Sequence, residues 1–110
     1  MAPGANHNGP VLSVCIPTHN GRAGTLSVLI ENLIEQARGL PNLVEVCVSD
    51  NASGDETAEI VADLAARATC PVRYRRHPHD LGLVANLLSA VELARGEEKF
   101  PIRFAIVATV

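Results

Sequence analysis

Polar residues follow three short apolar segments of this chain, and they are the residues that could do chemistry. In the first loop, a proline that fixes the chain direction precedes a hydroxyl, an imidazole and an amide that can hydrogen-bond a ligand: Pro17, Thr18, His19 and Asn20. An ordinary turn is the alternative, because an Asn directly before a Gly is typical of turns. The first loop therefore predicts either a ligand contact or a turn.

The second loop places a carboxylate, Asp50, at the carboxyl end of the second predicted strand, with a helix start just beyond it. Such a carboxylate can accept a hydrogen bond from a nucleobase N–H, and the free N–H groups of a first helical turn suit anions. Alternatively, Asp50 only orders its loop, and Ser53 and Asp55 are helix caps. The spacing of Ser53 and Glu56 has the form of a capping box and predicts a helix start near residue 54.

The third loop carries cations and two imidazoles, and the helix after it holds a polar residue, Asn86. His77 and His79 flank Pro78, which suggests a metal site, but no third ligand stands at a fitting position. Solvated loop histidines are therefore the favoured interpretation. Asn86 lies one position off the apolar stripe of its helix, so it projects toward the strand ends or borders the core. The chain has no GxGxxG and no GxxxxGKS/T sequence, which weighs against dinucleotide and P-loop sites.

A sheet and several helices must position these loops. Four short apolar or β-branched segments predict strands, at residues 11–16, 43–48, 72–75 and 102–110. Strands that alternate with helices predict right-handed βαβ crossovers, so the expected fold class is α/β, a mostly parallel open sheet with βαβαβα order. In such sheets ligands bind beyond the carboxyl ends of the strands, where the three loops lie. The alternation of apolar and charged residues at 72–75 predicts a strand near a sheet edge.

Each predicted helix carries an apolar stripe at helical spacing. The first stripe is Leu26, Leu29, Ile30, Leu33, Ile34 and Ala37, and Gly39 and Pro41 end that helix. The second stripe is Thr57, Ile60, Val61, Leu64, Ala65 and Ala68. The third helix, with Asp80 as a candidate cap and Gly96 as its stop, has the stripe Val84, Leu87, Leu88, Val91 and Ala94.

Length and composition limit the function. The 110 residues suffice for one domain, at residues 11–110, after a disordered leader at residues 1–10 without periodicity. A net charge of −3 and a single short basic cluster at 73–77 argue against nucleic acid as a partner. Three cysteines without CxxC spacing, Cys15, Cys47 and Cys70, indicate buried reduced thiols. The chain shows no signal peptide and no apolar stretch of about 20 residues, which predicts a cytoplasmic protein without a membrane span.

Taken together, the three loops resemble those of the family 2 glycosyltransferases, which have the GT-A fold. The matching blocks are residues 13–20, 48–57, 81–86 and 94–97. Each block alone is weak, whereas their order and spacing make the resemblance specific over about residues 11–97. By this resemblance, residues 11–110 are a partial glycosyltransferase 2-like domain, the Rossmann-like half that binds the nucleotide sugar.

The resemblance implies a site for a nucleoside-diphosphate sugar of the UDP or dTDP type. The residues that it assigns to this site are Pro17, Thr18, His19, Asn20, Asp50, Asn51, Arg76 and Asn86. Residues 17–20 would line the base and ribose pocket, Asp50 would recognise the nucleobase, and Arg76 and Asn86 would lie near the same pocket. The family often has a second acid directly before the matched Asp, and this chain has Ser49 there, so its ribose contacts depart from the family pattern.

After Glu97 the chain departs further from the family, which continues into an Asp-rich motif that binds a divalent cation, Mn²⁺ or Mg²⁺. No Asp or Glu follows Glu98, so the resemblance assigns no metal ligand and no catalytic residue here. The expectation is a truncated glycosyltransferase that binds a nucleotide at most and is inactive as this chain. The alternative is a non-catalytic nucleotide-binding or interaction module of the same fold. An open strand at 102–110 predicts self-association through that strand.

Overall fold

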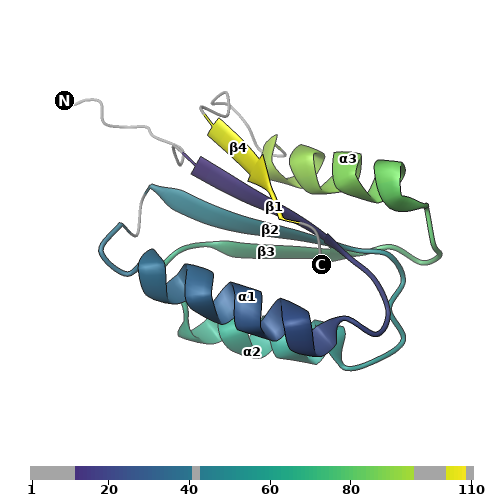
Figure 1. Ribbon diagram of the computed structural model, residues 1–110, viewed down its shortest axis with the longest axis horizontal. Helices are drawn as coiled ribbons and strands as arrows, with labels where there is room; N and C mark the ends of the chain where they lie inside the picture. Colours follow the sequence, from purple (N-terminus) through teal and green to yellow (C-terminus); the bar gives the residue numbers. More distant parts are fainter. Residues whose placement is uncertain (1–11, 41–42, 96–103, 109–110) are drawn as a thin grey trace.

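The computed structural model describes residues 12–40, 43–95 and 104–108. Strands and helices alternate along the chain (Figure 1). Their bounds are β1 Leu12–Thr18, α1 Ala23–Gln36, β2 Val44–Asp50, α2 Thr57–Arg67, β3 Val72–Arg76, α3 Leu83–Arg95 and β4 Phe104–Val107. The predicted α/β fold is confirmed. The predicted leader, the stop signals at Pro41 and Gly96, and most of the predicted strand at 102–110 lie outside the described residues.

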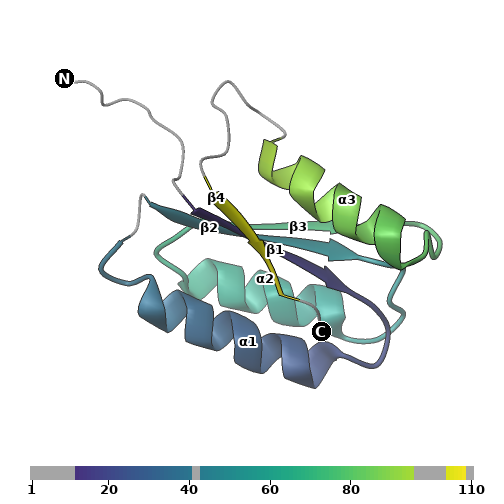
Figure 2. The same cartoon turned by 45° about the horizontal axis from the view of Figure 1, so that its top comes forward.

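The strands form one parallel sheet in the order β3-β2-β1-β4. Helices α1 and α2 cover one face of this sheet, and α3 covers the other (Figures 1 and 2). β3 lies at an edge, as its alternating residues predict. The carboxyl ends of β1, β2 and β3 therefore point toward the same end of the sheet, where the three polar loops follow them. None of the described helices is long and apolar enough to cross a membrane.

The face of the sheet beneath α1 and α2 is apolar, because alternate residues of β1 and β2 point toward these helices. The buried cluster includes Val14, Ile16, Val46, Val48, Leu26, Ile30, Ile34, Val61 and Leu64. Each fully buried aliphatic side chain contributes about 1.5–3 kcal/mol through the hydrophobic effect. This layer is the hydrophobic core, and it confirms the predicted inner stripes of the first two helices.

The face beneath α3 is polar. The register of the sheet places Ser13 beside Glu45 and Cys47 beside Arg73. Glu45 is 1% exposed, and its carboxylate accepts hydrogen bonds from the Ser13 hydroxyl at 2.7 Å and from Arg73 Nε at 2.9 Å. Burial raises the pKa of the Cys47 thiol, and the charge of Glu45 raises it further. The described cysteines are free and buried, as predicted.

β1 runs two residues further than the sequence predicts. The predicted strand ends at Ile16, but residues 17 and 18 still pair with β2. On the β4 side, the Cys15 carbonyl accepts from the Ala108 N–H at 3.1 Å. The backbone groups of residue 17 point to the same side as those of Cys15, which is the side of β4. The N–H that Pro17 lacks would therefore have pointed away from β2, and no bond to β2 is lost. The proline is therefore compatible with a strand whose end pairs on one side only within the described residues.

Helix α2 begins later than predicted, at Thr57 rather than near residue 54. Glu56 makes no capping bond, and Ser53 donates both its N–H and its hydroxyl to Asp50 instead. Asp55 accepts the Thr57 N–H at 3.0 Å and so takes the capping role. The capping-box prediction is wrong because Asp50 competes for the serine that would have capped the helix.

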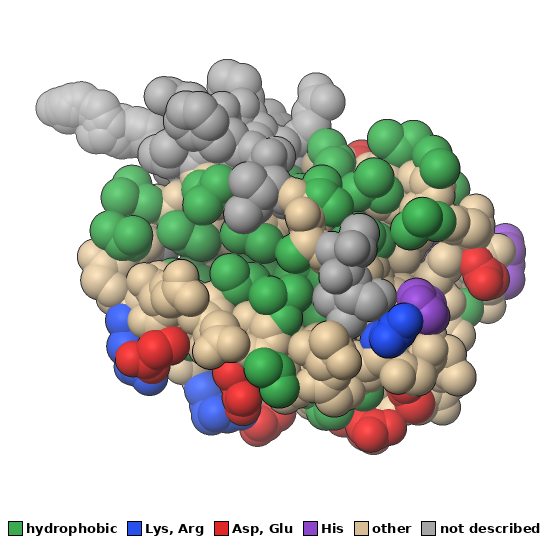
Figure 3. Space-filling model, in the orientation of Figure 1, with side chains coloured by type: hydrophobic (Ala, Val, Ile, Leu, Met, Phe, Trp, Pro, Cys, Tyr) green, Lys and Arg blue, Asp and Glu red, His purple; other side chains and the backbone are tan. Residues whose placement is uncertain are grey.

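The predicted inner stripe of α3 is also partly wrong. Val84 is 68% exposed and Leu88 is 61% exposed, whereas Asn86, Ser89 and Ala90 are buried. Hydrophobic side chains accordingly gather on the outer side of α3 in the space-filling view (Figure 3). The polar side of this helix faces inward because the sheet face beneath it offers hydrogen-bond partners rather than an apolar surface.

Replacing Arg73 by Met should lower the free energy of unfolding by about 1–3 kcal/mol, because it leaves the buried Glu45 carboxylate with fewer partners. Arg73 is 40% exposed, which places the effect below that of a fully buried pair. Urea denaturation measures the change.

The matched control is Arg67→Met, which removes the exposed ion pair with Asp63. We expect a loss of less than about 0.5 kcal/mol from this control. Equal losses in the two variants would show that Glu45 does not depend on Arg73. The double variant Glu45→Leu with Arg73→Met should recover part of the stability, because it removes the buried charge itself.

Candidate functional site

The three polar loops meet beyond the carboxyl ends of β1, β2 and β3, and each contains one residue with left-handed backbone. Gly21 has φ 87°, Ala52 has φ 62° and Gly82 has φ 86°. Glycine adopts this conformation without a Cβ penalty, whereas Ala52 carries a cost of about 1–3 kcal/mol that the surrounding contacts must offset. Backbone held in this way in the middle loop is typical of functional sites.

Hydrogen bonds tie the first loop to the second. The Asn20 side-chain oxygen accepts the Gly54 N–H at 2.9 Å, and the Asp55 carboxylate accepts the Gly21 N–H at 3.0 Å. Each loop thus supplies one side-chain acceptor and one backbone donor to the other. This reciprocal pair fixes the distance between the two loops.

A second set of bonds ties the middle loop to the third. Asn51 accepts the Leu81 N–H at 2.7 Å through its side-chain oxygen, and its amide nitrogen donates to the Gly82 carbonyl at 3.3 Å. The His77 N–H donates to the Asp50 carbonyl at 2.9 Å. The three loops are therefore one hydrogen-bonded unit rather than independent turns.

A pocket of about 450 Å³ lies among these loops. Its lining residues are His19, Asn20, Asn51, Ala52, Gly54, Asp55 and Asp80. Three of the residues expected from the sequence, His19, Asn20 and Asn51, are brought together here. Amides and an imidazole can donate and accept, whereas the carboxylates of Asp55 and Asp80 only accept when ionised. The pocket therefore suits a polar ligand that carries N–H and O–H donors.

Asp50 lies beneath the pocket and is completely buried. One carboxylate oxygen accepts from the Ser53 N–H at 3.1 Å and from the Ser53 hydroxyl, and the other accepts from the Tyr74 hydroxyl. Burial raises the pKa of Tyr74, and its bond to Asp50 raises it further, so the phenol remains a donor at neutral pH. In this conformation Asp50 orders its loop, which is one of the two roles that the sequence left open.

The remaining expected residues surround the pocket without lining it. Pro17 and Thr18 are buried in β1, and the Thr18 hydroxyl has no hydrogen-bond partner within the described part of the chain. Arg76 is exposed and donates through Nε to the Ser53 carbonyl at 2.9 Å, so the guanidinium lies against the second loop.

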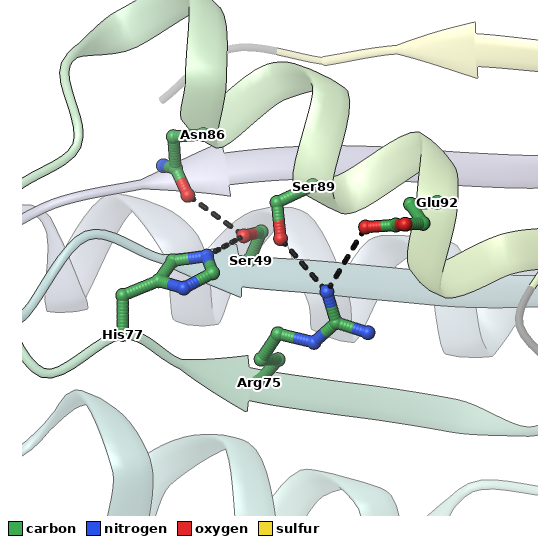
Figure 4. A network of polar contacts seen from close by, with 6 residues as sticks. All are labelled: Ser49, Arg75, His77, Asn86, Ser89 and Glu92. Carbon is green, nitrogen blue, oxygen red and sulfur yellow. Dashed lines mark hydrogen bonds and ion pairs between the residues drawn. The ribbon is translucent and has the colours of Figure 1, made fainter.

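Asn86 is buried and joins a polar network beneath α3 (Figure 4). Its amide nitrogen donates to the Thr18 carbonyl at 3.1 Å, and its oxygen accepts from the Ser49 hydroxyl at 2.7 Å. The Ser49 oxygen also lies 2.9 Å from His77 Nε2. Of the two loop histidines, His79 is exposed as predicted, whereas His77 is half-buried and bonded to Ser49.

Some contributors were missed at the sequence level. Tyr74 on β3 donates a hydrogen bond to Asp50 on the neighbouring strand β2, and Asp80 of the third loop lines the pocket. Tyr74 pairs with Val48 in the register of the sheet. Side chains two residues apart on a strand point to the same face, so Val48 and Asp50 share a face and Tyr74 lies on it too. The role of Ser49 as a link between His77 and Asn86 has no signal in the sequence, because it depends on the position of α3.

A larger hollow of about 850 Å³ lies beside α3 and is separate from this pocket. Its walls are Arg75, His77, Leu81, Ala85, Leu88, Ser89, Val91 and Glu92. The guanidinium of Arg75 is already bonded to Ser89 at 3.1 Å and lies 3.6 Å from Glu92. Because the three loops converge at the smaller pocket, that pocket at the strand ends is the candidate site.

The divalent cation expected from the family resemblance needs several hard oxygen ligands. Within residues 12–40, 43–95 and 104–108, no three His, Cys, Asp or Glu side chains group in a way that could hold a metal ion. The pocket carboxylates therefore do not form a complete cation site by themselves. No chemical step is routed through a metal on these residues.

The hydrogen bonds to Asp55 predict a pH dependence of stability. The Thr57 hydroxyl, followed by the N–H groups of Gly21 and Thr57, lowers the pKa of Asp55 below its ordinary value. The unfolded chain therefore binds a proton at Asp55 more readily than the folded chain does. The stability from this carboxylate is present above the unfolded pKa of about 3.9 and is lost as the pH falls through the lower folded value.

Urea denaturation of the wild type and of Asp55→Asn over a pH series measures this contribution. The difference in free energy of unfolding should be constant from about pH 7 to pH 5 and should shrink below about pH 4. Asp63→Asn, in an exposed helix ion pair, is the control. A difference at Asp55 that stays constant down to about pH 2.5 would mean that its hydrogen bonds do not favour the charged form.

Comparison with known proteins identifies the family of this chain. Residues 13–108 match the family described as Glycosyl transferase family 2. Over 88 residues, 79% of the chain, the sequence is 39% identical to the abequosyltransferase RfbV of Salmonella typhimurium, and this region is 26% of the length of that relative. Since the family match includes β1 to β3 and all three loops, the chain belongs to glycosyl transferase family 2.

Proposed function

We propose that this chain is the nucleotide-binding part of a glycosyltransferase, and that the pocket at the strand ends binds the nucleoside of a nucleoside-diphosphate sugar. The observation that supports this most directly is the hydrogen-bonded unit of three loops around His19, Asn20 and Asn51. A pre-formed pocket at the carboxyl ends of parallel strands is where nucleotides bind in open α/β sheets.

The chemistry of the pocket favours the nucleoside rather than the phosphates. Amide and imidazole groups of Asn51 and His19 can pair with the donors and acceptors of a base edge. The carboxylates of Asp55 and Asp80 can accept from ribose hydroxyls, and they would repel a diphosphate placed against them. We therefore orient the base and ribose inward and assign the diphosphate to the exposed side, where Arg76 offers a guanidinium.

The buried residues beneath the pocket serve it in different ways in this proposal. Asp50 holds the second loop, and it can reach a base only if Tyr74 or Ser53 releases one of its oxygens. Pro17 and Thr18 are buried in β1 behind the pocket lining and hold the end of that strand in place. Asn86 acts indirectly, through the strand ends that it joins.

We further propose a uracil or thymine base in the donor and, by similarity to the abequosyltransferase, a sugar as the transferred group. In family members a divalent cation, Mn²⁺ or Mg²⁺, would stabilise the charge of the diphosphate leaving group. We assign none of the described residues to that cation. A measured transfer of sugar by this chain would contradict the expectation that it is inactive. Nucleotide binding without transfer is expected both of the nucleotide-binding part of a transferase and of the alternative, a non-catalytic module of the same fold.

Titration with UDP and dTDP, by calorimetry or ligand-detected NMR, with and without Mn²⁺, tests the pocket. We expect saturable binding that is stronger than binding of GDP. His19→Ala should weaken it about three- to tenfold, because one ligand contact contributes about 0.5–1.5 kcal/mol.

His79→Ala is the matched control, because His79 is an exposed histidine of the third loop that does not line the pocket. We expect its affinity for UDP to stay within about twofold of the wild type. A folded wild-type chain without saturable binding, or equal losses at both histidines, would overturn the proposed site.

A further inference from the structure

Asn86 lies in a network whose hydrogen-bond directions are fully determined. The Thr18 carbonyl oxygen can only accept, so the atom of Asn86 that lies 3.1 Å from it is the amide nitrogen. The side-chain oxygen of Asn86 must then face Ser49, at 2.7 Å. The orientation of this amide follows from its partners and not from an arbitrary assignment.

The orientation of Asn86 determines the direction of the next hydrogen bond, between Ser49 and His77 of the third loop. Its hydroxyl has one proton, and the Asn86 oxygen, which cannot donate, requires that proton. The Ser49 oxygen can therefore only accept from His77, 2.9 Å away, so His77 Nε2 must carry a hydrogen. The chain of donors runs from His77 to Ser49 and to Asn86 (Figure 4). Asn86 in turn donates to the Thr18 carbonyl.

This chain of bonds joins the ends of three strands through one helix. Thr18 is the last residue of β1, Ser49 is the penultimate residue of β2, and His77 follows β3. Each of them is within three residues of a side chain that lines the pocket: His19, Asn51 and Asp80 respectively. A shift at any of the three strand ends would therefore move one wall of the pocket.

We propose that Asn86 is the positioning residue of the pocket, holding the three strand ends in place and fixing His77 as the Nε2–H tautomer. Asn86 lies inside the fold and outside the pocket lining, so it acts through the backbone rather than by touching the ligand. The effect on ligand affinity rests on the proposed function, whereas the tautomer of His77 does not.

The same view shows a neighbouring set of bonds that does not carry this role. Arg75 donates to Ser89 at 3.1 Å and lies 3.6 Å from Glu92 (Figure 4). Both partners lie on α3, and Glu92 is 75% exposed on its side chain. This set attaches α3 to β3, but it leaves β1 and β2 untouched.

The test compares the wild type with Asn86→Ala and with Asn32→Ala, a control at an exposed asparagine of α1. Nitrogen-15 spectra of the imidazoles at a pH of about 8.5, where histidine is normally neutral, report the tautomer of His77. A His77→Gln variant assigns the signal, and the exposed His19 and His79 serve as internal references.

In the wild type we expect His77 to be the Nε2–H tautomer alone. Without Asn86 the Ser49 hydroxyl can donate to His77, so His77 should become a mixture or shift to the Nδ1–H tautomer, because Asn86 acts on His77 through Ser49. The amide signals of His19, Asn51 and Asp80 should move in the same variant without any nucleotide present. Affinity for UDP should fall about tenfold, which corresponds to one lost buried hydrogen bond.

An unchanged His77 tautomer in Asn86→Ala, or a wild-type His77 with hydrogen on Nδ1, would overturn the proposal. If Asn86→Ala does not fold, Ser49→Ala replaces it, since it keeps the bond from Asn86 to Thr18 and should still release the tautomer of His77. A wild type that does not bind UDP would count against the proposed function alone. The spectra of the free protein would still decide whether Asn86 positions the pocket.

Discussion

The register between β1 and β2 is the constraint on which the rest of the structure depends. It places Thr18 beside Asp50, so both strands end at the same level and both loops begin there. The Asn51 N–H then donates to the Thr18 carbonyl at 2.9 Å, directly beyond the last strand pair. A shift of one strand by one residue would turn every side chain of that strand to the opposite face of the sheet, Thr18 on β1 or Asp50 on β2. The apolar side chains of the shifted strand would leave the core at the same time, so the core fixes the geometry of the site.

The two faces of the sheet have different chemistry, and the difference gives them different roles. The face beneath α1 and α2 contributes hydrophobic stabilisation through a continuous aliphatic cluster. The face beneath α3 holds Glu45, Ser49 and Arg75, whose hydrogen bonds need a defined partner geometry. Buried polar groups contribute little net stability and are costly when left unpaired. The position of α3 is therefore set by the geometry of its hydrogen bonds rather than by the apolar area that it buries. This helix supplies Asn86, the residue that joins the strand ends.

The sequence predicted the parts of the fold that depend on local pattern. The strands, the first two helical stripes and the edge position of β3 follow from periodicity, and the structure confirms them. The inner face of α3 could not be predicted in this way, because a helix usually buries its apolar stripe and here Val84 and Leu88 remain exposed. The late start of α2 was also beyond a local pattern, since Ser53 bonds to Asp50 rather than capping the helix. The expected pocket residues His19, Asn20 and Asn51 do converge, whereas the link from Ser49 to Asn86 requires the packing of a distant helix.

The charge of the pocket limits how a nucleotide sugar could lie in it. Asp55 is ionised at neutral pH, as an aspartate normally is, and hydrogen bonds from the Thr57 hydroxyl and two backbone N–H groups stabilise the charged form further and lower its pKa. A diphosphate brought against this carboxylate would meet repulsion, whereas ribose hydroxyls would gain acceptors. One of these bonds, from the Gly21 N–H, holds the first loop against the second, so the charge cannot move away without separating the two loops. A ligand that fits must therefore present its neutral, donor-rich end to the strand ends and keep its anionic end outside. That polarity agrees with the proposed binding of a nucleoside-diphosphate sugar, whose phosphates would remain accessible to cationic groups while its nucleoside is held.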